Sequence, residues 1–339
     1  MSSQDLRVEA IRAGLPESVH RVSCAVVTTD DRLLASSGDP EFRTWWRSGA
    51  KPLQAIPFVE DGAADRFGLG TEELALACAS HSSEPVHLEV INSFMAKVGL
   101  QESDLACGPH TPLSPAMAHL AAGGTLSPTA RWSNCSGKHA AMLALAKHHG
   151  WPLAGYQRTD HPVQQRILEA VCRWTGLAAP DIRLGVDGCT AVCFSLPIRR
   201  MALAFARLGL SSDPAPKRLC TAMTAHPMLV AGTARLCTDL MTAWPGHVIV
   251  KVGAEGIYCA AVPALRLGLA LKIEDGDMAS APLALLEALH QVLTRLHPAL
   301  AAELPLDQLG RHRAQPIRNT RSEITGERRA TGALRFYDA

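Results

Sequence analysis

The order of the predicted secondary structure constrains the fold of this chain more than any other sequence feature. Runs of apolar and β-branched residues predict a hairpin near the N-terminus, with strands over 21–29 and 32–37. Helical patterns follow, and strands return only late in the chain, over 247–252, 257–262 and 265–273. A long helix then ends near His297. Strands at both ends that pair in one antiparallel sheet, flanked by helices, predict an α+β fold.

The helical segments between the N-terminal hairpin and the three late strands predict a second, mostly helical lobe within one domain. We expect a sheet lobe from about 1–70 and 245–339, and a helical lobe from about 71–244. A cleft between two lobes is a common place for a small-molecule site. Residues 107–133 are rich in Pro, Gly and Ser and predict a long loop, a length usually associated with function.

Composition excludes several classes of partner. The 339 residues carry a net charge of +1, so no overall field attracts nucleic acid or anionic lipid. Seven Arg in the last 30 residues are mixed with acids, which favours a solvated edge. No stretch is apolar enough to span a membrane, and residues 1–14 lack the apolar core of a signal peptide. Ten cysteines are too few for a disulfide scaffold, so we expect free thiols and a cytoplasmic location.

Three segments predict nucleophilic chemistry on a serine. Ser48 and Lys51 form an S-x-x-K pair at an expected helix start, where one turn brings the amine beside the hydroxyl and lysine can act as a base. Lys251 precedes Val252 and Gly253 at a strand end, as K-T-G does in S-x-x-K enzymes, although valine replaces the hydroxyl residue. Ser80, in a Ser-His-Ser-Ser cluster, offers a second hydroxyl. Taken singly, each segment also fits a chance pair, a surface lysine or a polar loop.

Two cysteines have polar neighbours in the sequence, unlike most buried cysteines. Cys135 opens a helix among Asn, Ser, Gly, Lys and His, and Cys189 follows Asp187 and Gly188 in a turn. Thiolates near a histidine suit a soft metal ion. The spacing matches no zinc finger, and spacing alone favours buried structural cysteines.

Six motifs together resemble the class 3, or rhizobial-type, L-asparaginases, also called the asparaginase II family. In chain order they are RSGAKP at 47–52, CASHSSE at 78–84, SNCSGKH at 133–139, TDHPVQ at 159–164, VDGC at 186–189 and KVGAEG at 251–256. They cover most of the chain, and their joint occurrence is highly specific. The resemblance implies a serine β-lactamase- and glutaminase-like fold and the hydrolysis of L-asparagine to aspartate and ammonia.

The resemblance also implies which residues form the site. It implies two Ser–Lys tandems, Ser48 with Lys51 and Ser80 with Lys251. It further implies a zinc ion held by Cys135, Lys138 and Cys189 with a water, and a homodimer. The substrate carries both charges, so we expect Arg47 to hold its carboxylate, Asp187 its ammonium, and His139 to form a hydrogen bond beside them.

Two alternatives remain open. A different S-x-x-K hydrolase, such as a glutaminase, a peptidase or a β-lactamase, would use the same serine and lysine. A non-catalytic protein that senses zinc or redox state through Cys135 and Cys189 would bind metal without turnover.

Overall fold

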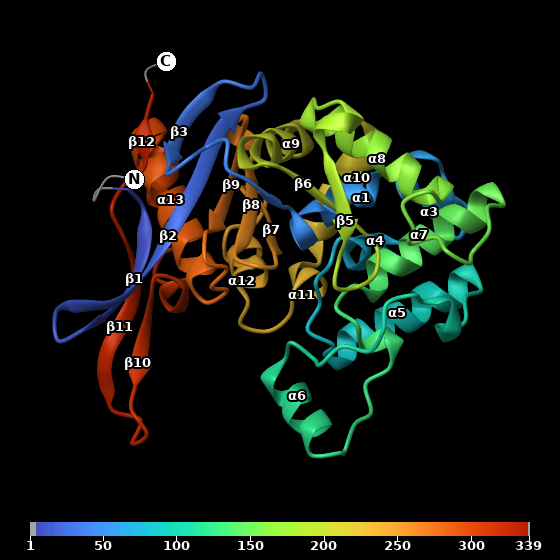
Figure 1. Cartoon of the computed structure of the whole chain (residues 1–339), viewed down its shortest axis with the longest axis horizontal. Helices are drawn as coiled ribbons and strands as arrows, with labels where there is room; N and C mark the ends of the chain where they lie inside the picture. The colour runs from blue at the N-terminus through green and yellow to red at the C-terminus, as the bar shows by residue number, and fades with distance from the viewer. Residues whose placement is uncertain (1–4, 338–339) are drawn as a thin grey trace. The chain divides into compact units, whose positions relative to one another are not determined.

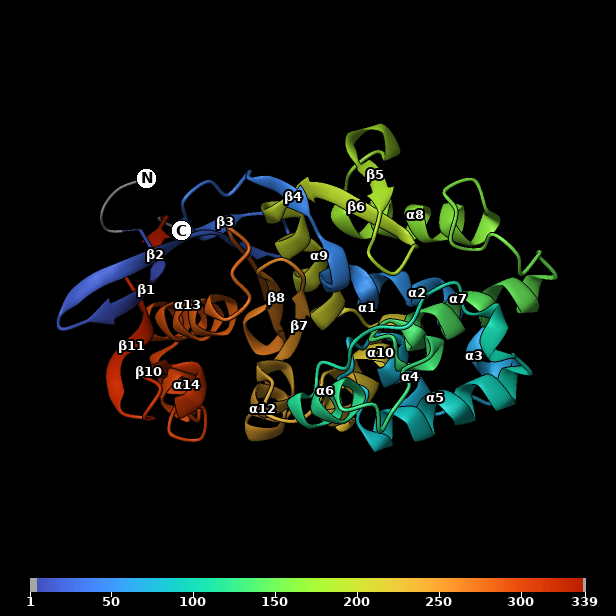
Figure 2. The ribbon, with the colours of Figure 1, turned by 60° about the horizontal axis from the view of Figure 1, so that its bottom comes forward.

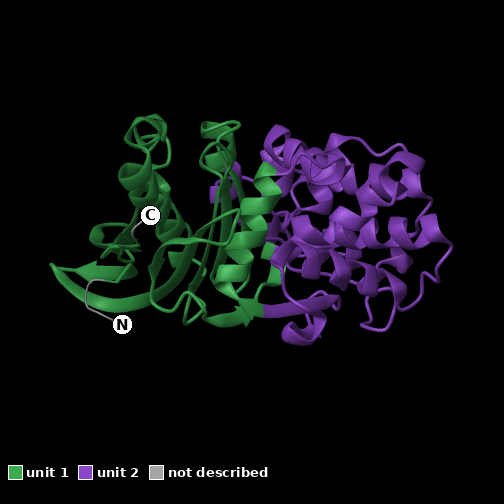
Figure 3. Ribbon diagram, turned by 90° about the horizontal axis from the view of Figure 1, so that it is seen from above, with its two compact units in different colours: residues 1–49, 196–210, 239–339 green, residues 50–195, 211–238 purple. Residues whose placement is uncertain are grey.

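The computed structural model describes residues 5–337, so residues 1–4 of the segment considered above for a signal peptide lie outside the described residues. The chain divides into two compact units (Figure 3). Unit 1 comprises residues 1–49, 196–210 and 239–339, and unit 2 comprises residues 50–195 and 211–238. The helix Ile198–Leu210 thus belongs with the sheet, and residues 50–70 belong with the helices. Within residues 5–337, no helix has the length and apolar character needed to cross a bilayer.

Unit 1 is built on an antiparallel sheet that joins both ends of the chain. Its strand order is β10-β11-β1-β2-β9-β8-β7, with β3 pairing β2 and β12. The strands are β1 (Arg7–Arg12), β2 (Leu15–Thr28), β3 (Leu33–Ser37), β7 (Ile249–Gly253), β8 (Ile257–Val262), β9 (Leu267–Ile273), β10 (Ala314–Arg318), β11 (Ile324–Thr331) and β12 (Arg335–Phe336). β2 pairs with β9, so N-terminal and C-terminal strands lie side by side (Figure 1). This pairing confirms the predicted α+β fold.

Two helices cover this sheet. α9 (Ile198–Leu210) packs on β9, β8 and β2, and α13 (Ser280–Leu296) packs on β11, β9, β1 and β8. Figure 2 shows them on opposite sides of the strands. Gly268 in β9 permits the close approach of α9, because a Cβ there would lie 2.1 Å from Ala202 O. The buried strands β7, β8 and β9 therefore form the core of unit 1. Unit 1 also holds β4 (Arg43–Trp45) and α14 (Pro298–Glu303).

Unit 2 surrounds one buried helix. α7 (Ser136–His149) is buried along residues 136–146 and packs against α4 (Thr71–Ala77), α5 (Pro85–Val98) and α8 (Pro162–Thr175). Gly137 sets the distance to α4, because a Cβ there would lie 2.2 Å from Leu76 O. Unit 2 also holds α1 (Lys51–Gln54), α2 (Ile56–Glu60), α3 (Ala63–Arg66), α6 (Pro115–Ala122), α10 (Pro214–Ala225), α11 (Pro227–Val230) and the β5 (Arg183–Val186) pairing with β6 (Val192–Pro197). α12 (Leu236–Ala243) and β6 cross the division between units.

Several predicted elements were wrong in detail. The single helix expected from Ser48 is a 3-10 turn, η1 (Arg47–Ala50), followed by α1, α2 and α3, with Gly62 at φ +89° breaking the run. The expected loop over 107–133 contains α6, which starts at Pro115, a residue that fits the first turn of a helix. β1 was missed, and the Arg-rich end forms strands β10 to β12.

Candidate active site

Unit 1 brings the Ser48 segment against the strand that carries Lys251. Gly253 ends β7, and a Cβ there would lie 2.8 Å from Trp46 O and 2.9 Å from Gly49 N. The glycine two residues after Lys251 is thus needed for this backbone approach. Trp46 is buried and anchors the segment, because its Nε1 donates to Cys259 Sγ over 3.3 Å.

Lys251 is fully buried, which contradicts the simple interpretation of an exposed strand-end lysine. Its Nζ donates to Val252 O over 2.8 Å. Arg47, immediately before Ser48, has φ +50°, a left-handed conformation that non-glycine residues rarely adopt. Both Arg47 and Ser48 are half-buried. Such conformations are frequent at functional sites.

Unit 2 places Lys51 beside Ser80. The Lys51 side chain is fully buried, and its Nζ lies 2.5 Å from Ala79 O, 3.0 Å from Ser80 Oγ and 3.1 Å from Asn134 O. A lysine amine can donate to three acceptors. Lys51 donates to two backbone carbonyls and to the Ser80 hydroxyl oxygen, and these contacts fix its amine beside Ser80.

The loop that follows Ser80 is held by a buried histidine. His81 Nδ1 accepts from the Ser83 backbone N–H over 3.2 Å, and its Nε2 lies 2.9 Å from Ser136 Oγ. Burial lowers the pKa of His81 well below its usual value, helped by the nearby charges of His87 and Lys51. The neutral ring links the loop after Ser80 to the first turn of α7.

Arg235 was missed by the sequence reasoning. It donates to Ser80 O, to Ala231 O over 3.0 Å and to Ser82 Oγ over 3.4 Å. These contacts tie the Ser80 loop to the segment that precedes α12. No motif marked this arginine, since its partners are mostly backbone carbonyls that come together only in the fold.

Cys135, Lys138 and Cys189 form a second cluster in unit 2. Lys138 Nζ lies 3.0 Å from Cys189 Sγ, and the Cys135 thiol lies 3.1 Å from Asn134 Oδ1 and faces Cys189, with which it shares a hydrogen bond. That hydrogen bond and the charge of Lys138 lower the pKa of Cys189 to about 5, against the effect of burial. The same hydrogen bond and burial raise the pKa of Cys135 to about 12. The cluster is thus a buried lysine–thiolate pair with a neutral thiol beside it.

This cluster fits a zinc ion by its donor atoms. Two sulfurs and one amine, all buried and with the amine 3.0 Å from the Cys189 sulfur, are ligands that zinc accepts, although the lysine must lose its proton first. Over residues 5–337, no group of three or more His, Cys, Asp and Glu side chains is placed to hold a metal. Any metal here would therefore depend on Lys138 as a ligand.

His139 follows Lys138 and is fully buried. Its Nδ1 lies 2.5 Å from the hydroxyl of Tyr156, a residue that sequence reasoning missed, and its Nε2 has no hydrogen-bond partner among the described residues. Burial and the charge of Lys138 lower the pKa of His139 to about 3. Asp187 is half-buried in the turn before Cys189, where its Oδ1 accepts from Gly188 N–H over 2.8 Å.

The predicted site residues thus form two sets. Arg47, Ser48 and Lys251 lie in unit 1, and the other seven lie in unit 2, namely Lys51, Ser80, Cys135, Lys138, His139, Asp187 and Cys189. Chain continuity links the two sets, because η1 with Ser48 runs directly into α1 with Lys51.

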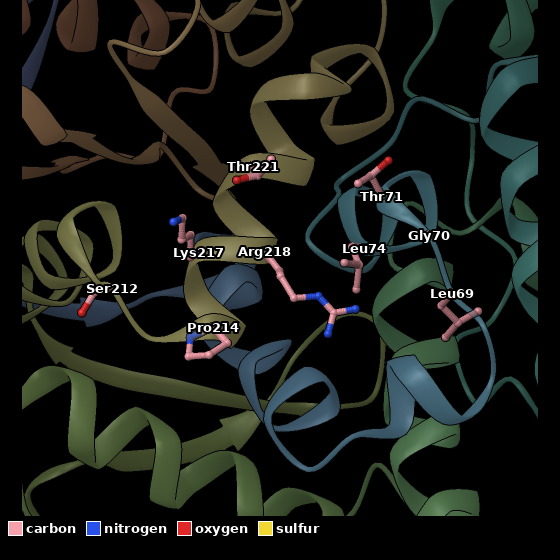
Figure 4. A pocket seen from close by; sticks show the side chains of 9 residues that line it. All are labelled: Leu69, Gly70, Thr71, Leu74, Ser212, Pro214, Lys217, Arg218 and Thr221. Carbon is pink, nitrogen blue, oxygen red and sulfur yellow. The ribbon is translucent and has the colours of Figure 1, made fainter.

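A separate cavity of about 520 Å³ in unit 2 holds none of these residues. It lies between the starts of α4 and α10, and Arg218 extends across it (Figure 4). Its lining is Leu69, Gly70, Thr71, Leu74, Ser212, Pro214, Lys217, Arg218 and Thr221. Arg218 is already paired with Asp65 at 2.8 Å. The cavity is therefore distinct from the predicted chemistry.

Among solved structures, the chain is similar to Mglu in its native form (16% identity, 85% of this chain and 68% of that chain covered, TM-score 0.45). It is also similar to a mutant simvastatin synthase from Aspergillus terreus (12%, 74% and 86%, TM-score 0.38) and a β-lactamase from Mycobacterium bovis (14%, 81% and 94%, TM-score 0.35). A search of the curated proteins finds no match. The family described as L-asparaginase II matches residues 8–330, nearly the whole chain. The chain therefore belongs to the L-asparaginase II family and is an amidohydrolase.

Proposed function

We propose that the chain hydrolyses L-asparagine to L-aspartate and ammonia with Ser48 as nucleophile. The observation that carries the proposal is the buried Lys51 amine, which has two carbonyls and the Ser80 hydroxyl within 3.1 Å. Its position three residues after Ser48 supports a role as the base for that serine. Family membership supports an amide substrate.

The proposed reaction has two halves. Ser48 Oγ attacks the side-chain amide carbon, its proton passes to Lys51, and the C–N bond breaks as ammonia leaves with a proton relayed through Ser80 and Lys251. A water then attacks the acyl-serine ester, gives its proton back along the same groups, and releases aspartate and the free Ser48 hydroxyl. The two steps consume one water and release one ammonia, so atoms and charge balance.

Charged side chains would orient the substrate. We assign the α-carboxylate to Arg47 and the α-ammonium to Asp187, with His139 as a hydrogen-bond partner. Arg47 is adjacent to the nucleophile, and Asp187 and His139 are adjacent to Cys189 and Lys138. Two opposite charges at fixed positions select a small zwitterion over a neutral amide.

Zinc is the metal that we propose for Cys135, Lys138 and Cys189. When bound, it would supply a fixed positive charge that organises the pocket around His139 and Asp187. The serine and the lysine already provide a nucleophile and a base, so the metal is not needed to activate the attacking group.

Ammonia release from asparagine tests the proposal. We expect turnover by the parent, no measurable turnover by Ser48→Ala, and parent-like turnover by Ser103→Ala, an exposed control. Glutamine and nitrocefin, run in parallel, distinguish the alternative hydrolases. Full activity of Ser48→Ala would show that Ser48 is not the nucleophile. Metal binding without any turnover by the parent would favour a sensor.

We further propose a homodimer that acts on small molecules in the cytoplasm. The resemblance of the six motifs supports the dimer, and the cysteine usage of the sequence supports a reducing location.

A further inference from the structure

We propose that Tyr156 positions His139 by holding it in the Nε2–H tautomer, so that His139 donates a hydrogen bond to an oxygen of the substrate and is not a metal ligand. This inference rests on the proposed function for the identity of the substrate. The tautomer itself follows from the contacts of the two side chains.

The Tyr156 hydroxyl has two partners. It accepts from the Ala106 backbone N–H over 2.9 Å, and it lies 2.5 Å from His139 Nδ1. A hydroxyl has one proton to donate. Among the described residues, His139 Nδ1 is the acceptor within reach of that proton, so the tyrosine donates and the ring nitrogen accepts. A neutral imidazole whose Nδ1 accepts carries its proton on Nε2.

The Nε2–H group then lacks an acceptor. Its nitrogen is buried and has no hydrogen-bond partner over residues 5–337, while the whole side chain is fully buried. A buried donor left unpaired costs free energy, which is recovered when a ligand supplies an acceptor. A carboxylate or carbonyl oxygen fits this donor, and an ammonium does not.

The surrounding structure holds Tyr156 in place. Gln164 Nε2 donates to Tyr156 O over 2.9 Å, and Thr190 Oγ1 donates to Ala106 O over 3.2 Å. Gln164 belongs to the TDHPVQ motif, and Thr190 follows Cys189 directly. These contacts therefore link α8 and the turn at Cys189 to one orientation of the His139 ring. They give the TDHPVQ motif a structural role, which the proposed catalytic and metal-binding residues did not explain.

The same tautomer removes His139 from the metal site. A metal binds a ring nitrogen through its lone pair, and here the Nδ1 lone pair faces Tyr156 while Nε2 carries a proton. Lys138 is thus left as the nitrogen ligand beside the two cysteines, although a histidine is its immediate neighbour.

Long-range proton–nitrogen NMR of ¹⁵N-histidine protein reads the tautomer directly, with His139→Gln identifying the signals of His139. We expect the Nε2–H pattern in the parent and a mixture of tautomers in Tyr156→Phe. Tyr337→Phe removes a phenol that is hydrogen-bonded to Ser36 at 2.8 Å in unit 1, and it should leave the pattern unchanged. An Nδ1–H pattern in the parent would overturn the inference, whatever the activity.

Kinetics and metal content complete the test. In Tyr156→Phe we expect the KM for asparagine to rise about five- to thirtyfold, with kcat within about threefold of the parent. In a His139→Gln background the same change should have little further effect, because the two residues act through one contact. Bound zinc per chain should stay unchanged in both single variants. Unchanged KM in Tyr156→Phe, or zinc lost in folded His139→Gln, would contradict the inference. A parent that fails to hydrolyse asparagine would refute the proposed function and leave the NMR result to decide on the tautomer.

Discussion

The side chain of Lys51 illustrates what the fold adds to a sequence motif. The motif pairs Lys51 with Ser48, and the structure adds the Ser80 hydroxyl, 29 positions further along the chain, at 3.0 Å. The resemblance paired Ser80 with Lys251, which lies in the other unit. In the proposed reaction, Lys51 would take the proton of Ser48 and pass it to the Ser80 hydroxyl.

Removing either proposed sulfur ligand should weaken substrate binding strongly and slow the chemical step less. Cys135→Ala and Cys189→Ala each leave two of three ligands, so we expect zinc loss and a KM raised about tenfold or more, with kcat reduced less. Steady-state kinetics with metal analysis of each variant measure this. Cys172→Ala, on α8 and half-exposed, is the matched control and should keep both zinc and kinetics.

A collapse of kcat at unchanged KM in these variants would assign the metal to the chemical step. Parent-like kinetics in a zinc-free variant would make the metal site purely structural. Either result would contradict a role in organising the pocket.

The residues that the motifs predicted for the site differ from those that the motifs missed in the kind of contact that each makes. Ser48, Lys51, Cys135 and Cys189 stand in motifs, because side-chain chemistry needs particular residue types. Arg235 contacts mainly backbone carbonyls, and Tyr156 contacts a backbone N–H group and a histidine ring nitrogen. The fold brings these partners together from distant parts of the chain, so no local sequence pattern predicts the contacts.

Helix α7 depends on a glycine for its position. Gly137→Ala would place a Cβ 2.2 Å from Leu76 O, so α7 and α4 must separate. We expect the free energy of unfolding to fall by about 1–3 kcal/mol in urea denaturation, with activity reduced because α7 carries Lys138 and His139. Gly310→Ala, where a Cβ meets open space, should keep or slightly raise stability. Equal stability of the two variants would show that α7 and α4 are not closely packed at Gly137.

The start of α4 should make stability depend on acid pH. Glu73 accepts from Lys97 Nζ at 2.6 Å, Ser93 Oγ at 2.9 Å and Gly70 N at 2.8 Å. Although burial acts in the opposite direction, these donors lower the pKa of Glu73 below its usual value. A lowered pKa adds stability above the unfolded-state value, about 4.3, which is lost as the pH falls through the folded-state value.

Melting temperatures from pH 7 to 3 measure this dependence. Glu73→Gln should melt a few degrees below the parent at pH 7, and the difference should shrink below about pH 4 as the parent's carboxylate takes up its proton. Glu72→Gln, exposed in the same turn, should show little difference at any pH. A constant difference across the range would show that the charge of Glu73 contributes no pH-dependent stability.

Helices and strands that are long apolar runs were predictable from the sequence. The positions at which a helix is interrupted or begins were harder to predict. β8 matches its predicted bounds, because a fully buried strand is a continuous apolar run. Residues 48–68 keep a helical composition but turn at Gly62, and α6 forms within a Pro- and Gly-rich segment. Such boundaries follow from tertiary contacts and positive φ values that composition does not specify.

At the scale of the whole chain, the sheet was predictable because its strands lie near both ends of the sequence. β1 was missed, since Arg7, Glu9 and Arg12 leave it without a continuous apolar run or a regular alternation, and so was its pairing with β11. That pairing uses the Arg-rich end expected as a solvated edge, and most of those arginines are exposed.

The proposed homodimer is testable by sedimentation velocity. The chain has a mass of 36.2 kDa, so we expect a species of twice this mass at micromolar concentration. Dilution into the nanomolar range with an activity assay would then show whether one copy suffices for turnover. A single monomeric peak at micromolar concentration would contradict the dimer.

If Ser48 is the nucleophile, the substrate acylates it, and rapid-quench mass spectrometry detects that acyl-enzyme. Enzyme mixed with asparagine, quenched in acid and digested should give the Ser48 peptide carrying one aspartyl group as an ester. Ser48→Ala should carry none, and Ser103→Ala should match the parent. An aspartyl group on a different residue, or turnover by Ser48→Ala, would exclude Ser48 as the nucleophile.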